Sequence, residues 1–133
     1  MSAAASKKVL NEGSPQAVLL VEDDVLIRLA VAAELRSEGL TVVEAACAAE
    51  ALSILESGMG IGAVFTDIYL PGELDGVGLA RVIGERFPHI PCILTSGNRL
   101  PPNAPSDCLF VAKPYDPRHV LRLLKDTLRK AMH

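Results

Sequence analysis

The chain has 133 residues, of which 50% are apolar and 22% are charged, and it contains no tryptophan. This length suits one compact domain with a substantial core and leaves no room for a second domain. Thirteen basic and sixteen acidic residues give a formal net charge of -3, so the basic surface expected of a nucleic-acid-binding protein is missing.

The N-terminal segment and the cysteines predict a cytoplasmic protein. Residues 1–15 lack the apolar core of a signal peptide, and we expect a flexible tail there, ahead of a domain over residues 16–131. No apolar run approaches the roughly 18 residues of a membrane span. The three cysteines, Cys47, Cys92 and Cys108, lie in or beside apolar runs without Cys-x-x-Cys spacing, as buried free thiols do. A reducing compartment follows from this pattern.

Short apolar runs alternate with helical periodicity along the first half of the chain. Residues 17–21, AVLLV, predict a strand, and the next apolar residues recur at the spacing of an amphipathic helix: Leu26, Leu29, Ala30 and Ala33. Gly39 is expected to end this helix, and residues 41–45, TVVEA, predict a second strand. A second helical stripe runs up to Gly58 and consists of Ala48, Ala51, Leu52 and Leu55.

The same unit repeats in the second half. Residues 63–67, AVFTD, predict a third strand, and a helix that stops before Pro88 carries the stripe Leu79, Ala80, Ile83 and Phe87. Residues 92–96 and 108–112 predict the last two strands. A C-terminal helix has one apolar face, formed by Val120, Leu123, Leu124, Thr127, Leu128 and Ala131. Residues 97–107, GNRLPPNAPSD, contain three prolines, so we expect a loop or a single turn there.

Apolar strands separated by helices predict an α/β fold, in which helices cover both faces of a doubly wound, mostly parallel sheet. The carboxyl ends of the strands then share one edge, where open sheets of this kind bind their ligands. The residues expected at that edge are polar: Glu22, Asp23, Asp67, Ser96 and Lys113.

These residue types together suit phosphoryl chemistry. Three crowded carboxylates need a cation to stay ionised, and an all-oxygen site favours a hard ion such as Mg²⁺. Lys113 adds a second positive charge, and a hydroxyl from Ser96 or Thr95 completes a set that can hold a phosphoryl group. Asp67 is the best candidate for the nucleophile, because it ends a central strand alone while the acids after the first strand form a natural metal pair.

Each signal taken alone has a simpler interpretation. Asp24 is expected to cap a helix, and the neighbouring acids could merely favour the helix dipole. Asp67 could open a turn, and Lys113 could be a solvated charge. Their joint occurrence at matching strand ends favours the functional interpretation. The stretch GMGIG, residues 58–62, precedes a strand instead of following one, so we predict a loop that ends a helix there and not a nucleotide site.

Four motifs in this order resemble the receiver domain of bacterial response regulators in two-component signalling: LLVEDD, FTDIYLPGELDG, LTSG and VAKP. The resemblance covers about residues 16–131. It implies a flavodoxin-like (βα)5 fold with five strands in the order 2-1-3-4-5, and a cis bond between Lys113 and Pro114. The family usually has a helix between strands four and five, so the prolines of residues 97–107 imply a shortened or irregular fourth helix.

The resemblance also implies a Mg²⁺ site and a phosphoacceptor. Asp67 would accept a phosphoryl group from a sensor histidine kinase or a histidine phosphotransfer protein. Asp23 and Asp67 would bind Mg²⁺ directly, Glu22 would act through water, and the backbone carbonyl of Tyr69 would supply another ligand.

Three further roles follow from the same resemblance. Lys113 would pair with the phosphoryl oxygens, and Ser96 would be the switch hydroxyl that moves toward the phosphate. Phe110 would be the aromatic side chain whose rotamer follows that hydroxyl. Strand alternation favours Ser96 over the adjacent Thr95 for this position.

We therefore expect a stand-alone receiver that signals to a downstream protein effector by conformational change, without being an enzyme with a metabolite product. A weak dimer is possible. Two rival hypotheses are a receiver-like binding module that is not phosphorylated, and a small Mg²⁺-dependent phosphatase that uses an aspartyl phosphate. The phosphatase would need a cap over its substrate, for which the chain is too short.

Overall fold

The computed structural model describes residues 16–131, so the predicted flexible tail lies outside the described residues. The elements are β1 (Ala17–Val21), α2 (Val25–Ser37), β2 (Val42–Ala45), α3 (Ala48–Glu56), β3 (Ile61–Asp67), α4 (Gly76–Arg86), β4 (Cys92–Ser96), β5 (Leu109–Ala112) and α5 (Pro117–Ala131). The five strands pair in parallel in the order β2-β1-β3-β4-β5. The predicted doubly wound sheet and its strand order are confirmed.

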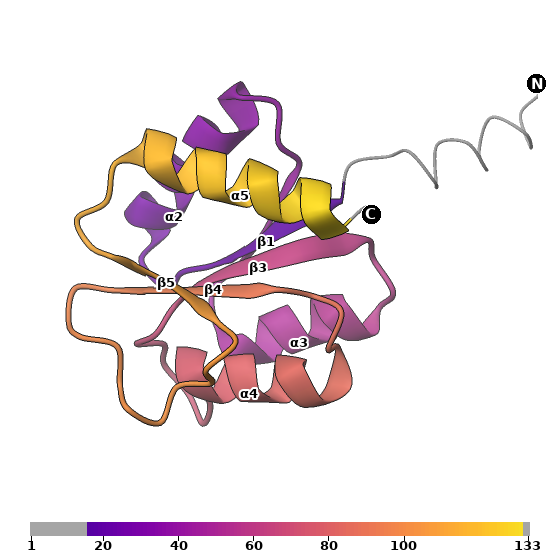
Figure 1. The fold of residues 1–133 in the computed structure, drawn as a ribbon, viewed down its shortest axis with the longest axis vertical. Coiled ribbons are helices and arrows are strands. Elements are labelled where there is room, and N and C mark those ends of the chain that lie inside the picture. The colour runs from indigo at the N-terminus through magenta and orange to yellow at the C-terminus, as the bar shows by residue number, and fades with distance from the viewer. Residues whose placement is uncertain (1–15, 132–133) are drawn as a thin grey trace, which may run out of the picture.

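Helices cover both faces of this sheet. In Figure 1, α2 and α5 lie on one side of the strands, and α3 and α4 lie on the other. The buried apolar residues accordingly form two clusters, one on each face of the sheet. Strands β1, β3 and β4 are buried along their whole length, which explains why they are continuous apolar runs in the sequence.

The segment between β4 and β5 forms turns instead of a helix, as its prolines predict. Backbone bonds close two of these turns, from Ala104 N to the Pro101 carbonyl at 3.1 Å and from Cys108 N to the Pro105 carbonyl at 3.3 Å. Arg81 on α4 reaches across and donates to the Asn103 carbonyl at 2.7 Å. As a result β5 has less cover than the inner strands, and Leu109 at its start is 44% exposed.

Helix α2 is present, but its predicted apolar stripe does not face the sheet. Leu26 is 79% exposed and Leu29 is 50% exposed, whereas the buried residues are Ala32 and Leu35. The inner face also contains Arg28, a charged residue that periodicity places on the solvent side. The prediction of which face packs was therefore wrong, because α2 is apolar on its outer face as well as on its inner one.

The predicted cap at Asp24 and the cis bond are confirmed. The Asp24 carboxylate accepts a hydrogen bond from Ile27 N at 3.1 Å, which caps α2. Asp75 caps α4 by accepting from Gly78 N at 2.9 Å. The Lys113–Pro114 peptide bond is cis.

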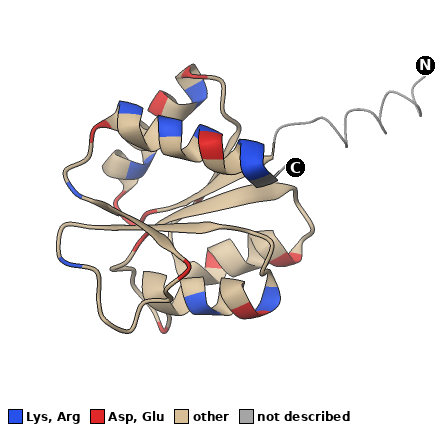
Figure 2. Cartoon of the chain, in the orientation of Figure 1, with Lys and Arg blue, Asp and Glu red and all other residues tan. Residues whose placement is uncertain are grey.

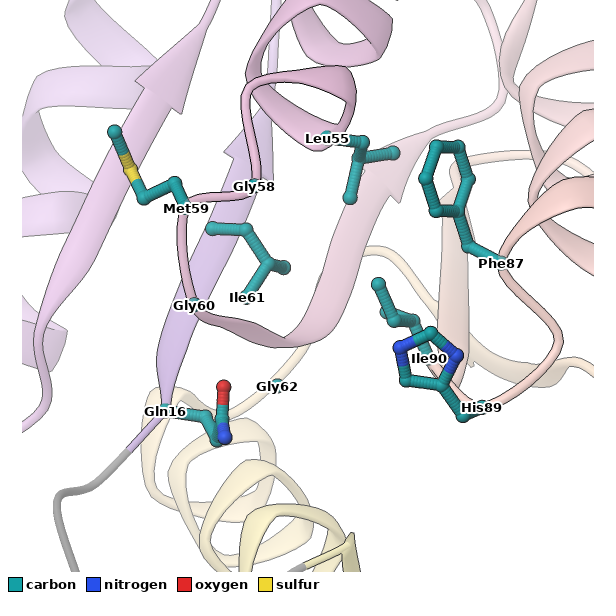
Figure 3. A pocket seen from close by; sticks show the side chains of 10 residues that line it. All are labelled: Gln16, Leu55, Gly58, Met59, Gly60, Ile61, Gly62, Phe87, His89 and Ile90. Atoms are coloured by element: carbon teal, nitrogen blue, oxygen red, sulfur yellow. The ribbon is translucent and has the colours of Figure 1, made fainter. Parts of the chain in front are cut away.

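A cavity of about 410 Å³ lies at the edge of the sheet where the strands begin, far from the acidic residues. Figure 3 shows its lining, which includes His89 but no lysine or arginine. Gly58, with φ of +81°, follows the end of α3, and β3 begins at Ile61. The glycine-rich stretch thus ends a helix and enters a strand, and it is not a phosphate-binding loop. Within residues 16–131, no helix has the length and apolar character needed to cross a membrane.

Candidate functional site

The polar residues singled out in the sequence meet at the carboxyl edge of the sheet. Glu22 directly follows β1, Asp67 ends β3, Ser96 ends β4 and Lys113 directly follows β5. Because β3 pairs with β1 on one side and with β4 on the other, Asp67 occupies the centre of this edge. The predicted placement of these residues is confirmed, while their chemical roles remain predictions.

Lys113 joins two buried acids. Its Nζ lies 2.8 Å from Asp67 Oδ2 and 3.5 Å from Glu22 Oε1. Glu22 is 6% exposed and Asp67 is 9% exposed, so solvent screens these ion pairs only weakly. The backbone of Lys113 is held as well, because its N–H donates to the Ser96 carbonyl at 2.8 Å. The lysine is thereby fixed beside the proposed nucleophile.

A group of three carboxylates can hold a metal ion. Glu22, Asp23 and Asp67 each offer one oxygen, and these oxygens all lie within 4.8 Å of one another. Asp23 is exposed, so the cluster opens to solvent and an ion can reach it. The donors are all carboxylate oxygens, which is the chemistry that Mg²⁺ prefers. The residues present therefore fit the ion that the family resemblance implies.

The electrostatics of Glu22 favour a cation at this position. Burial raises the pKa of Glu22, and the neighbouring charge of Asp67 raises it further, although the Asp24 N–H and Lys113 act in the opposite direction. Asp24 N donates to Glu22 Oε2 at 3.1 Å. A bound divalent ion would favour the ionised form of this acid, which the protein alone disfavours.

Tyr69 lies close to the Asp67 carboxylate. Its backbone N–H donates to Asp67 Oδ1 at 3.1 Å, while Lys113 bonds the other carboxylate oxygen. Each oxygen of Asp67 therefore has its own hydrogen-bond donor. This contact keeps the Tyr69 N–H beside the carboxylates, while the use of its carbonyl as a metal ligand remains a prediction.

The ion pairs of Lys113 predict a pH-dependent stability. Burial alone would lower the pKa of Lys113, but the hydrogen bond and charge of Asp67, with a smaller effect of Glu22, raise it above its ordinary value of 10.5. A raised lysine pKa contributes stability that is fully present below pH 10.5 and is lost as the pH rises through the folded-state pKa. We expect wild type to exceed Lys113→Gln in free energy of unfolding at about pH 9, and this difference to shrink by about pH 12. Urea unfolding without Mg²⁺ measures it, and a pH-independent difference would contradict the prediction.

Gly76 is a site residue that the sequence reasoning missed. Its N–H donates to the Ile68 carbonyl at 2.6 Å. A Cβ added at Gly76 would lie 2.1 Å from the Asp67 carbonyl oxygen and 2.6 Å from Ile68 Cα, both of them backbone atoms. Only glycine fits there without displacing the end of β3. The sequence offered no sign of this close approach.

Replacement of Gly76 should disturb the backbone at Asp67, whereas the same change elsewhere on α4 should not. We expect Gly76→Ala to lower the free energy of unfolding by about 1–3 kcal/mol, because the backbone at Asp67 must move. Gly84→Ala is the matched control, since a Cβ there meets nothing within 4 Å. This control should gain about 0.5–1 kcal/mol from helix propensity. Urea unfolding of both variants tests the pair, and equal effects would contradict the steric explanation.

Arg28 is a second residue that sequence reasoning missed. From the first turns of α2, its Nη1 donates to the Glu22 carbonyl at 2.9 Å and its Nε donates to Glu44 Oε1 at 3.2 Å. Glu44 also pairs with Arg36 at 3.0 Å. These bonds connect the edge strand β2 to the backbone at the acid pair, so Arg28 supports the position of Glu22.

Two buried hydroxyls lie at the end of β4. Ser96 Oγ accepts a hydrogen bond from Asn98 N at 3.0 Å. Thr95 is in register with Asp67, and its Oγ1 is buried without a hydrogen-bond partner in the described part of the chain. Phe110 is half-buried and packs against the core on the α3 and α4 side. The switch roles of Ser96 and Phe110 remain predictions.

Comparison with known proteins identifies the class. The sequence profile of the response regulator receiver domain matches residues 18–125 of the chain. This match covers most of the sequence, with four strands included in full and β1 from its second residue onward. The chain belongs to the response regulator receiver domain family of two-component systems.

Individual relatives agree with this class. The chain is 43% identical over 82 residues to a putative NtrX-like response regulator of Rickettsia felis, a match covering 61% of this chain and 17% of that protein. It is 36% identical over 119 residues to the sensor kinase CckA of Brucella abortus, covering 85% of this chain and 12% of that protein. The crystal structure of a CheY-like receiver domain protein from Methanospirillum hungatei superimposes with a TM-score of 0.79 at 28% identity, covering 89% of this chain and 97% of that one. The chain thus spans less than a fifth of the length of these two curated relatives.

Proposed function

We propose that the protein accepts a phosphoryl group on Asp67 in a Mg²⁺-dependent reaction and passes the resulting conformational change to a partner protein. The observation that carries this proposal is the contact of Lys113 Nζ with Asp67 Oδ2 at 2.8 Å, inside a cluster of three carboxylates. A degenerate binding module would have no need to keep a half-buried lysine between two buried acids, since such an arrangement is costly to desolvate.

In the proposed reaction, four side chains share the work. One Asp67 carboxylate oxygen attacks the phosphorus of a phosphohistidine, the new O–P bond forms, and the P–N bond to the imidazole breaks. Lys113 Nζ lies within hydrogen-bonding distance of Asp67 and would pair with the incoming phosphoryl oxygens. Glu22 and Asp23 would hold Mg²⁺ with Asp67, and the ion when bound supplies positive charge that offsets the negative phosphoryl group.

The exposed apolar side of α2 supports a protein as the phosphoryl donor. Its first turns follow the acid pair directly, and four of their side chains are at least 43% exposed: Val25, Leu26, Ile27 and Leu29. Such a patch beside a reactive site is typical of a protein interface. Helix α5 contacts α2 and carries several basic residues, drawn in blue in Figure 2. A helix bearing the donor histidine, apolar at its centre and acidic at its rim, would match this surface.

Removal of one apolar side chain from this patch should slow phosphorylation by a protein donor but not by a small-molecule donor. We expect Leu26→Ser to slow phosphotransfer from a cognate histidine kinase by roughly tenfold or more, since truncation of a central apolar contact costs at least about 1–2 kcal/mol. Phosphorylation by acetyl phosphate should stay unchanged. Met59→Ser is the matched control, because Met59 is 50% exposed at the opposite edge of the sheet. Equal slowing of both donors, or an effect of the control, would contradict docking on α2.

The proposal is tested by incubating the protein with acetyl phosphate and Mg²⁺ and measuring the intact mass. One phosphoryl group should be added to each chain, and chelation of Mg²⁺ should prevent the gain. No gain under any condition would favour the unphosphorylated binding module. Rapid turnover of small phosphate esters with release of inorganic phosphate would instead favour the phosphatase.

The proposal also concerns the classes of protein that act upstream and downstream. The likeness to part of a sensor kinase and to part of a response regulator supports a histidine kinase or phosphotransfer protein upstream, and a protein effector downstream. Action without an output domain, a cytoplasmic location and weak dimerisation remain predictions. A role as a signalling phosphoacceptor, as opposed to a metabolic enzyme, belongs to the same proposal.

A further inference from the structure

Two of the three cysteines lie side by side where β4 and β5 begin, at the opposite end of these strands from the acids. Ile93 is in register with Leu109, so the preceding residues, Cys92 and Cys108, are neighbours across the strand pair. Both side chains pack against the core on the α3 and α4 side of the sheet. The two thiols are close enough for each to shift the pKa of the other. The fold thus brings together two thiols that are sixteen positions apart in the sequence.

The two thiols differ in accessibility and reactivity. Cys92 is 6% exposed, whereas Cys108 is half-buried, and both line a surface cavity of about 240 Å³ together with Asp107 and His89. Interaction with the Cys108 thiol raises the pKa of Cys92, and burial raises it further. The same interaction lowers the pKa of Cys108, although burial acts against it. The Cys108 sulfur therefore has more thiolate character and is the one that reagents from solvent can reach.

We propose that Cys108 and Cys92 form an oxidation site at which a peroxide converts the two thiols into an intrachain disulfide. The Cys108 thiolate attacks one peroxide oxygen, the O–O bond breaks, and after protonation Cys108 sulfenic acid and one water remain. The Cys92 sulfur then attacks the Cys108 sulfur, the S–O bond breaks, and the second oxygen leaves as water. Each thiol loses one proton and one electron, and hydrogen peroxide is reduced to two waters. Because this chemistry uses none of the acids, it is independent of the proposed phosphorylation.

The disulfide would change the segment that replaces the usual fourth helix. Residues 97–107 lie between the two cysteines, so the bond would close them into a covalent loop. It would also tie the start of β4, which ends at Ser96, to the start of β5, which leads into Lys113. Cys47 cannot substitute for either partner within one chain, because it lies at the start of α3 and contributes no side chain to this cavity.

The test treats the reduced wild-type chain with hydrogen peroxide, blocks the remaining thiols under denaturing conditions, and maps tryptic peptides. Trypsin does not cut before proline, so Cys92 lies in the peptide of residues 87–99 and Cys108 lies in that of residues 100–118. We expect these two peptides to be linked, with a loss of two hydrogens, and the bond to be reversed by dithiothreitol. Cys47, in the peptide of residues 37–81, should remain free and blocked once. Linkage through Cys47, a disulfide between chains, or three blocked thiols after oxidation would overturn the proposal.

Two variants assign the order of the steps. In Cys92→Ser, the first step should still occur but not the second, so Cys108 should accumulate as a sulfenic acid that dimedone traps. Cys47→Ser is the matched control and should form the same disulfide as wild type. Trapping at Cys92 in a Cys108→Ser variant, with none at Cys108 in Cys92→Ser, would show that the assignment of the attacking thiol is wrong. The wild-type peptide map decides the site itself even where a variant fails to fold.

Discussion

Asp67→Asn should gain no phosphoryl group from acetyl phosphate and Mg²⁺, while wild type gains one. The amide has nearly the same shape as the carboxylate but lacks the anionic oxygen that attacks phosphorus. Asp67 is 9% exposed and contacts Lys113, so no neighbouring acid has the same position at the centre of the sheet edge. Intact mass spectrometry measures the result. Asp126→Asn, the same change in α5 away from the carboxyl edge, should be phosphorylated like wild type.

One outcome would contradict the assignment of Asp67 as the acceptor. A phosphoryl gain in Asp67→Asn equal to that of wild type would place the acceptor on another residue, and the exposed Asp23 would be the first to examine. Circular dichroism and urea unfolding of the variant must accompany the test, because Asp67 also accepts hydrogen bonds from Lys113 and from Tyr69 N. A folded variant without phosphoryl gain is the expected combination.

Asp23→Ala and Asp24→Ala should change different properties, although the two residues are adjacent: the first should weaken Mg²⁺ binding and the second should lower stability. Asp23 belongs to the carboxylate cluster, and its removal should weaken Mg²⁺ binding by about 100-fold or more, beyond the loss seen when only an outer-shell partner is removed. Asp24 caps α2, so its removal should lower the free energy of unfolding by about 1 kcal/mol with little change in Mg²⁺ affinity. Calorimetric titration with Mg²⁺ and urea unfolding measure the two quantities.

The adjacent pair also tests the assignment of the acids. If Asp24→Ala abolished Mg²⁺ binding and Asp23→Ala only lowered stability, the assignment would be displaced by one residue. The hydrogen bonds of the structure oppose that possibility, because Asp24 Oδ1 accepts from Ile27 N and its own N–H donates to Glu22 Oε2. Asp24 is thus engaged at the start of the helix.

Strand positions and the polar residues at their ends could be predicted because they depend on local signals. Continuous apolar runs mark strands that are buried on both faces, and a parallel sheet then places Asp67 and Lys113 on one edge. The strand order came from the family resemblance, since periodicity does not specify which strands are neighbours. The prolines of residues 97–107 excluded an ordinary helix by the same local logic.

The remaining features depend on tertiary contacts that no local pattern encodes. The packed face of α2 was mispredicted because the helix has apolar residues on both faces, and Arg28 faces inward only because Glu44 and the Glu22 carbonyl bind it. The need for glycine at position 76 comes from the backbone of Asp67, nine residues earlier in the sequence. The contact between Cys92 and Cys108 likewise depends on the register of β4 and β5.

The chemical location of the phosphoryl group tests the central claim most directly. Borohydride reduces an aspartyl phosphate to homoserine, so treatment of the phosphorylated protein followed by peptide sequencing identifies the acceptor. We predict homoserine at position 67, within the tryptic peptide of residues 37–81, and unchanged aspartate at positions 23, 24 and 75. Homoserine at any other position, or a phosphoryl group that resists borohydride, would contradict the assignment of Asp67 as the phosphoacceptor.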